Sequence, residues 1–223
     1  MSVTEKAIFP ALGAIFLWGA LNAVPVMADP TPRSSEPYVQ SDYDHLAFKT
    51  AAKVGEPAPT FTLDAVVGKE FKKISLTDYR GKWVVLFFYP LDFTFVCPTE
   101  IKGFNVALRD FENLKAVVLG ASVDSKWSHK AWLERGDLGD LKFPLLSDIK
   151  KETARKYGIL DEREGVSLRG LFIIDDKGIL QYQSVNNLSV GRSVEETLRT
   201  LEALQTGELC PINWKPGQKT LGK

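Results

Sequence analysis

Cysteine is the residue type in this sequence with the clearest capacity for covalent chemistry. Only two cysteines occur, Cys97 and Cys210, together with two histidines. Two cysteines are too few for a disulfide scaffold, and two histidines are too few for an obvious metal cluster. An isolated cysteine is most often an inert packing residue. Chemistry at Cys97 therefore requires surroundings that stabilise its thiolate, because the thiolate is the nucleophilic form.

The segment around Cys97 offers such surroundings. Pro90–Glu100 (PLDFTFVCPTE) joins an apolar run to a stretch with helical spacing of apolar residues, namely Ile101, Phe104, Leu108 and Phe111. Cys97 is expected at or near the first turn of that helix, where free backbone amides and the helix dipole favour an anion. Pro98 suits the same turn, because its missing amide costs nothing there. The pattern therefore predicts a reactive thiolate.

The remaining pattern predicts an α/β fold around this segment. The expected strands are Trp83–Tyr89, Val117–Val123, Leu171–Ile174 and Ile179–Val185, and the expected helices are Ile101–Phe111, Lys126–Arg135, Lys150–Tyr157 and Ser193–Leu204. Their alternation predicts a sheet flanked by helices. The turn Asp175–Gly178 adds a hairpin, which makes the sheet mixed. Ligands bind such sheets beyond the carboxyl ends of the strands, where Pro90–Glu100 is expected.

Several short motifs resemble those of the typical two-cysteine peroxiredoxins. Pro90, Thr94 and Cys97 are similar to the active-site signature of that family. The other motifs are Val96–Glu100 (VCPTE), Gly207–Pro211 (GELCP) and Trp214–Gly217 (WKPG), and the resemblance extends from about Val54 to the end of the chain. It implies a thioredoxin-like fold with a central mixed β-sheet. It also implies a peroxidase that reduces hydrogen peroxide and organic hydroperoxides, in antioxidant defence and redox homeostasis.

The resemblance implies roles for individual residues. Cys97 is the implied peroxidatic cysteine, which attacks the peroxide. Arg169 matches the family's active-site arginine, and a permanent cation there would stabilise the thiolate and bind the peroxide oxygens. Thr94 is expected to orient the peroxide, a role compatible with capping a helix. Pro90 is expected to shape the pocket and exclude water, and Glu100 to support the arginine by a hydrogen bond.

The role of Cys210 has two interpretations, because its long separation from Cys97 leaves open whether the two meet. A static intrachain disulfide is one interpretation in a secreted chain. The resemblance implies that Cys210 is the resolving cysteine, which attacks the sulfenic acid of Cys97 on another subunit. An external, thioredoxin-like dithiol would reduce the resulting intersubunit disulfide. The resemblance further implies a homodimer, possibly a decamer, and no metal, haem or flavin cofactor.

The N-terminal part of the chain is expected to lie outside the folded domain. Residues 1–28 contain an uncharged apolar run and end in a small-residue cleavage pattern, which predicts a signal for export to the periplasm or the medium. An uncleaved membrane anchor is the alternative. Residues 29–53, with several prolines and serines, are expected to form a linker or arm. The peroxiredoxin domain is expected over residues 54–223, with a C-terminal arm that carries Cys210.

Composition narrows the possible partners. The 28 basic and 28 acidic side chains give a net charge of zero, which provides no long-range attraction for nucleic acid. Membrane association is expected only if the N-terminal segment is an uncleaved anchor. His45 and His129 are isolated and are expected in structural or surface positions. Two other functions remain open from the sequence: a chaperone or redox-signalling binding protein on the same fold, and a noncatalytic secreted domain with one static disulfide.

Overall fold

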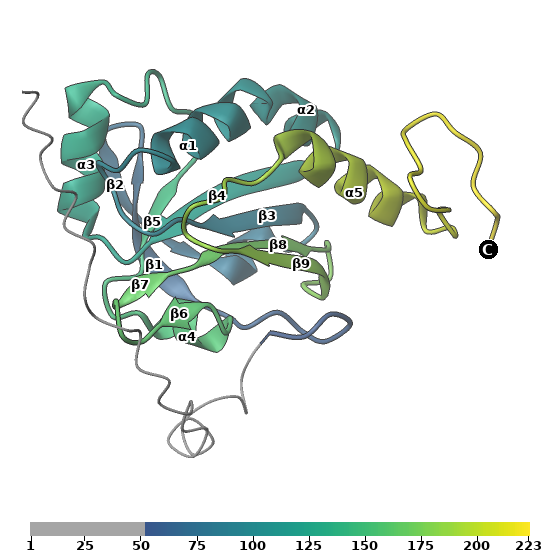
Figure 1. Cartoon of the computed structure of the whole chain (residues 1–223), viewed down its shortest axis with the longest axis horizontal. Helices are drawn as coiled ribbons and strands as arrows, with labels where there is room; N and C mark the ends of the chain where they lie inside the picture. The colour runs from purple at the N-terminus through teal and green to yellow at the C-terminus, as the bar shows by residue number, and fades with distance from the viewer. Residues whose placement is uncertain (1–51) are drawn as a thin grey trace, which may run out of the picture. The chain divides into compact units, whose positions relative to one another are not determined.

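A seven-stranded mixed sheet lies at the centre of the protein (Figure 1). The computed structural model describes residues 52–223. In spatial order the strands are β2 (Glu70–Ser75), β1 (Thr62–Val67), β5 (Leu145–Ser147), β4 (Ala116–Ser122), β3 (Trp83–Phe88), β8 (Arg169–Ile174) and β9 (Leu180–Asn186). β4 pairs in parallel with β3 and β5, whereas the other neighbours are antiparallel. The mixed α/β sheet predicted from the sequence is confirmed.

The central strand β3 is apolar on both faces because both faces of the sheet are covered. Val84, Leu86 and Phe88 belong to one hydrophobic core, and the alternate residues Val85, Phe87 and Tyr89 belong to the other. Successive side chains of a strand point to opposite faces, so a continuous apolar run is what a doubly covered strand requires. β3 thus ends in the interior, two residues before Pro90.

Helices cover both faces of the sheet. On one face lie α1 (Cys97–Val106), α2 (Leu108–Asn113), α3 (Lys126–Arg135) and α5 (Val194–Thr206), which contribute apolar side chains to the core that contains Cys97. On the other face lie α4 (Glu152–Lys156) and the small hairpin of β6 (Leu160–Asp161) and β7 (Val166–Ser167), drawn below the sheet in Figure 1. A short 3₁₀ helix, Leu76–Tyr79, joins β2 to β3.

The structure differs from the sequence-based expectation in two places. The helix expected over Ile101–Phe111 is wrong in its continuity, because Ala107 separates α1 from α2 with φ −87° and ψ 6°. Ile101, Phe104 and Phe111 still reach the same core. The sequence did not predict β1, β2, β5 or the two-residue strands β6 and β7. β2 (EFKKIS) is an edge strand with polar side chains, and β5 has only three residues, so neither carries a strong strand pattern.

The chain folds back on itself after α5. Leu209 pairs with the end of the chain, since its amide donates to the Gly222 carbonyl (2.8 Å) and its carbonyl accepts from the Leu221 amide (2.8 Å). Trp214 lies in the segment between Leu209 and Leu221, and its side chain is buried. Its Nε1 donates to the Gln218 carbonyl at 3.0 Å. Within residues 52–223, none of the helices is long and apolar enough to cross a membrane. The predictions for residues 1–28 and most of 29–53 lie outside the described residues.

Candidate active site

Cys97 is the first residue of α1, a ten-residue helix whose N-cap position is Val96. Its side chain is fully buried in the core between the sheet and the helices. Pro98 occupies the second helical position. The location that the sequence predicted for Cys97 is therefore confirmed. At this end of the helix the free amides and the helix dipole favour negative charge on the sulfur.

Arg169 reaches Cys97 from a separate strand. It is the first residue of β8, next to β3 in the sheet, and its side chain is buried. Its Nη1 donates to the Cys97 Sγ at 3.5 Å. Its Nε donates to the carbonyl of Leu188 at 2.7 Å, in the loop that follows β9. These two hydrogen bonds fix the direction of the guanidinium group, so that one of its N–H groups points at the Cys97 sulfur.

Glu100 holds two arginines rather than one. Its Oε2 accepts from Arg169 Nη1 at 2.6 Å, which is the hydrogen bond expected from the sequence. Arg192 donates to the same carboxylate from Nε (2.7 Å), from Nη2 (2.8 Å) and from its backbone amide (2.9 Å). Glu100 lies one helical turn after Cys97, so α1 carries both the thiol and the group that orders the arginines. Short, paired contacts of this kind are among the strong hydrogen bonds of proteins.

Arg192 is the functional candidate that the sequence analysis missed. Its Nη1 donates to the carbonyls of Phe88 (2.7 Å) and Gly170 (2.8 Å), at the ends of the adjacent strands β3 and β8. Its guanidinium also lies 5.3 Å from the ring centroid of Phe87. Ser193, the next residue, gave a signal for the start of a helix. Nothing in the local pattern marks the preceding arginine as buried.

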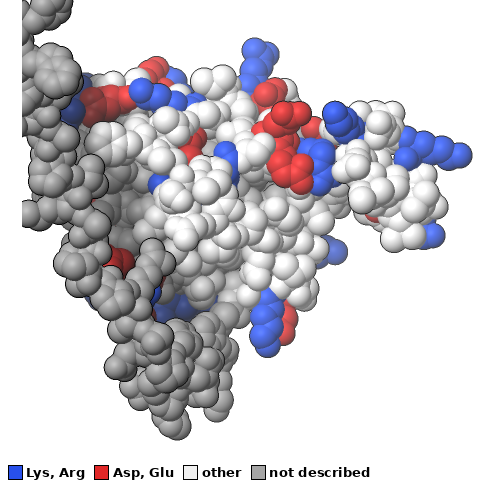
Figure 2. All heavy atoms as spheres, in the orientation of Figure 1, with Lys and Arg blue, Asp and Glu red and all other residues white. Residues whose placement is uncertain are grey.

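The buried charges at the site leave an excess of positive charge. The side chains of Arg169, Arg192 and Glu100 are at most 4% exposed, and they carry two positive charges against one negative. Burial lowers the pKa of Arg192 from its usual value, and its bonds to Glu100 act in the opposite direction. Through Arg169, this positively charged cluster is in direct contact with Cys97 Sγ. On the visible surface, in contrast, acidic and basic side chains are interspersed (Figure 2).

Thr94 and Pro90 lie in the loop between β3 and α1. The Thr94 hydroxyl donates to the carbonyl of Leu91 at 3.0 Å, and its side chain is partly exposed. Thr94 is not the N-cap of α1, because that position belongs to Val96, so the capping role considered for it is wrong. Pro90 is buried, two residues after the end of β3.

Cys210 and His129 lie apart from this cluster. Cys210 is a free, partly buried thiol after α5, with its Sγ 3.8 Å from the Ala203 carbonyl and 3.6 Å from the Thr206 hydroxyl. It is not bonded to Cys97, which is also free. His129 is fully buried and contacts Asp92, in agreement with the structural position expected for it. His45 lies outside the described residues.

Comparison with known proteins shows the family of the chain. The AhpC/TSA family matches residues 54–183. A putative peroxiredoxin of Porphyra purpurea is 57% identical over 178 residues, which cover 76% of this chain and 89% of the relative. The chloroplastic 2-Cys peroxiredoxin of Spinacia oleracea is 54% identical over 177 residues, 75% of this chain and 67% of the relative. The structure of the reduced 2-Cys peroxiredoxin of Plasmodium vivax matches with a TM-score of 0.72 and 46% identity, over 75% and 91% of the two chains.

The thioredoxin-like fold and the named relatives show that the protein is a thiol-dependent peroxidase. The chain belongs to the AhpC/TSA family and, within it, to the two-cysteine peroxiredoxins. It is accordingly an oxidoreductase with an antioxidant function. The binding-protein and noncatalytic alternatives are not favoured.

Proposed function

We propose that Cys97 is the peroxidatic cysteine and that it reduces hydrogen peroxide and organic hydroperoxides. The observation that carries this proposal is the 3.5 Å contact between Arg169 Nη1 and Cys97 Sγ at the start of α1. The Cys97 thiolate attacks the terminal peroxide oxygen, and the O–O bond breaks. The leaving oxygen takes a proton from solvent and departs as an alcohol, or as water from hydrogen peroxide. The sulfur becomes a sulfenic acid.

The neighbours of Cys97 have distinct roles in this proposal. Arg169 stabilises the thiolate and the negative charge that develops on the peroxide oxygens. Glu100 orders Arg169, which its 2.6 Å hydrogen bond supports. Thr94 orients the peroxide through its hydroxyl, and Pro90 shapes the pocket and excludes water. Arg192 supplies the second buried positive charge, and it acts through Glu100.

Cys210 is the proposed resolving cysteine. Its thiol attacks the sulfenic sulfur of Cys97 on a second subunit, so that an S–S bond forms, the S–O bond breaks, and the hydroxyl leaves as water with the thiol proton. The neighbours of Cys210 support a meeting with another chain, because Leu209 and Ile212 are 61% and 91% exposed. A thioredoxin-like dithiol then returns both cysteines to the reduced form.

We also propose that the enzyme is a homodimer, possibly assembled into a decamer. β9 supports the dimer, since it is the last strand at one edge of the sheet and exposes Val185. An edge strand of this kind presents backbone groups that a second chain can pair with. Exposed aromatic side chains support a further contact, among them Phe95 in the active-site loop and Trp127 on α3.

We also propose roles for the N-terminal segments of the chain. Residues 1–28 are an export signal or, alternatively, a membrane anchor, residues 29–53 are a linker, and residues 54–223 are the catalytic domain. Three of the relatives are chloroplastic proteins, which supports a targeting segment ahead of the domain.

The Cys210→Ser variant tests the proposed resolving step. Oxidised wild-type protein is expected to run as a dimer on a nonreducing gel, because the chain has only two cysteines and the proposal joins them between subunits. The variant is expected to consume about one equivalent of peroxide per subunit and then to stop cycling with a dithiol. A monomeric oxidised wild type would contradict the proposal, since it indicates a bridge within one chain.

A further inference from the structure

One face of α3 contacts the loop that carries Thr94. Ser128, His129, Trp132 and Arg135 are spaced by about one helical turn or less, so they share this face. Each of them contacts either Asp92 or Phe93, the two residues before Thr94. The short loop between β3 and α1 is therefore supported from a helix that lies outside the catalytic cluster.

The inner half of this contact is a buried hydrogen-bond network. The Asp92 carboxylate accepts from the Ser128 hydroxyl (2.7 Å) and the Tyr89 hydroxyl (2.9 Å), and His129 Nδ1 lies 2.8 Å from it. His129 Nε2 lies 3.1 Å from the Leu146 carbonyl, which fixes the ring at its other nitrogen. Buried polar networks with every member satisfied are rigid. Asp92 is thereby held in one position.

The outer half holds Phe93 in an unusual backbone conformation. Phe93 has φ 57°, in the left-handed region that non-glycine residues rarely adopt. Its ring lies 5.6 Å from the ring of Trp132, and the Arg135 guanidinium lies 5.6 Å from its centroid on the face. A non-glycine residue keeps such a backbone conformation only where its surroundings stabilise it. A change at Phe93 moves Thr94, because the two share a peptide bond.

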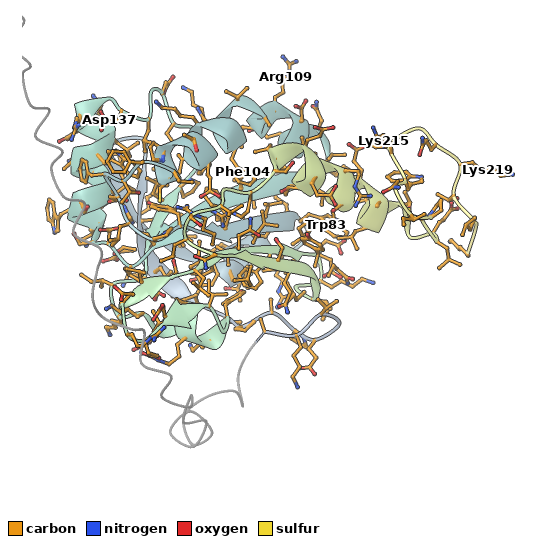
Figure 3. All side chains as sticks on the ribbon, viewed as in Figure 1. Trp83, Phe104, Arg109, Asp137, Lys215 and Lys219 are labelled. Atoms are coloured by element: carbon orange, nitrogen blue, oxygen red, sulfur yellow. The ribbon has the colours of Figure 1, made fainter. Side chains whose placement is uncertain are left out.

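Asp137 joins the two side chains that hold the Phe93 ring. Its Oδ2 accepts from Trp132 Nε1 at 3.2 Å and lies 3.1 Å from Arg135 Nε. Gly136 ends α3 with φ 86°, a left-handed conformation that turns the chain sharply. The turn brings the Asp137 carboxylate back against the last turns of α3. Figure 3 shows Asp137 at this end of α3. Trp132 and Arg135 are thus fixed to each other through one carboxylate.

We propose that Arg135 and Asp137 are positioning residues for peroxide reduction. With Trp132 they fix the Phe93 backbone, and the Phe93 backbone fixes the Thr94 hydroxyl for the incoming peroxide. The inference rests on the role proposed above for Thr94. These residues are separate from the cluster of Arg169, Arg192 and Glu100. That cluster acts at the Cys97 sulfur, whereas the α3 residues act, through Thr94, on the peroxide.

Two reactions of Cys97 separate this role from a merely structural one. Peroxide reduction needs Thr94, whereas alkylation by iodoacetamide needs the thiolate and access to it but no oriented peroxide. Both rates are measured on reduced protein in the Cys210→Ser background, so that only Cys97 reacts. Arg135→Ala is expected to slow peroxide reduction by about two- to fivefold, the range of one exposed cation–π contact. Asp137→Ala, which frees both side chains, is expected to slow it at least as much, by about five- to tenfold.

The controls are chosen from the same loop and helix. Alkylation is expected to stay at the rate of the parent protein in both variants, and Arg135→Lys is expected to restore peroxide reduction because it keeps a cation over the ring. Asp140→Ala removes a neighbouring acidic residue that pairs with Lys142 instead, and it is expected to change neither rate. Arg135 is an exposed side chain, so its variants report on the proposal even if Asp137→Ala fails to fold.

A double-mutant cycle with Thr94→Val decides the outcome. If the support acts through Thr94, Asp137→Ala has no further effect on peroxide reduction once Thr94 is valine. Wild-type peroxide rates in Arg135→Ala and Asp137→Ala would overturn the inference, and so would equal losses of peroxide reduction and alkylation. If Thr94→Val alone leaves the peroxide rate unchanged, the role proposed for Thr94 fails. If Thr94→Val slows the reaction but the other variants do not, only the support by α3 fails.

Discussion

Replacing Arg169 with alanine is expected to lower the rate constant for peroxide reduction by about a hundredfold or more, the usual cost of losing one donor from a charge-stabilising site. The variant removes the N–H that lies 3.5 Å from Cys97 Sγ. It also removes the positive excess, because Glu100 and Arg192 alone carry balanced charges. The measurement is stopped-flow mixing of reduced protein with hydrogen peroxide, read by the disappearance of the Cys97 thiol.

Two further variants test whether the slower peroxide reduction results from losing the guanidinium group at this position or from losing any positive charge. Arg169→Lys keeps the charge but not the fork that donates to both Leu188 and Glu100, so an intermediate rate is expected. Arg109→Ala removes an exposed arginine from α2 (Figure 3) and is expected to react like the wild type. Wild-type kinetics in Arg169→Ala would remove this arginine from the mechanism.

Replacing Glu100 with alanine is expected to lower the free energy of unfolding by about 3–5 kcal/mol, the range for breaking a buried ion pair by removing one partner. The reason is that Arg169 and Arg192 are both buried and both depend on this carboxylate for their counter-charge. Without it, the two buried guanidinium groups lose the carboxylate that pairs with both of them. Urea unfolding followed by circular dichroism measures the change.

Glu196→Ala is the matched control for that prediction. Glu196 pairs with Arg199 at the same distance as Glu100 with Arg169, 2.6 Å, but on the exposed side of α5. Ion pairs in contact with water contribute about 0–1 kcal/mol, so only a small loss is expected. Equal losses in the two variants would contradict the view that burial of the arginines, rather than the contact itself, makes Glu100 important.

The elements that the sequence predicted well have a strong local pattern. β3 is a continuous apolar run, and α3 was expected at the residues where the structure has it, Lys126–Arg135. α5 begins within one residue of its expected start because Ser193 caps it by accepting from the Glu196 amide. Strands β1 and β5 depend on pairing with distant residues, as in the Val66–Leu145 pair, and no local pattern contains that information.

Most members of the candidate site were predictable from the sequence, but Arg192 and the geometry of the site were not. The resemblance named Cys97, Arg169 and Glu100, and the amphipathic pattern placed Cys97 at a helix start. The contact between Cys97 and Arg169 spans 72 residues of sequence, so it exists only once β3 and β8 pair. Arg192 escaped notice for the same reason, since its partners come from β3, β8 and α1. Phe93 combines a left-handed conformation with contacts to α3, and no local sequence pattern contains either of them.

The central claim is that the Cys97 thiolate is the group that reduces peroxide. The most direct test mixes reduced wild-type protein with less than one equivalent of hydrogen peroxide, quenches samples over time with an alkylating reagent, and maps the cysteine peptides by mass spectrometry. The claim predicts that free Cys97 is lost at the rate at which peroxide disappears, ahead of or together with Cys210. Peroxide that disappears while Cys97 stays fully alkylatable would contradict it.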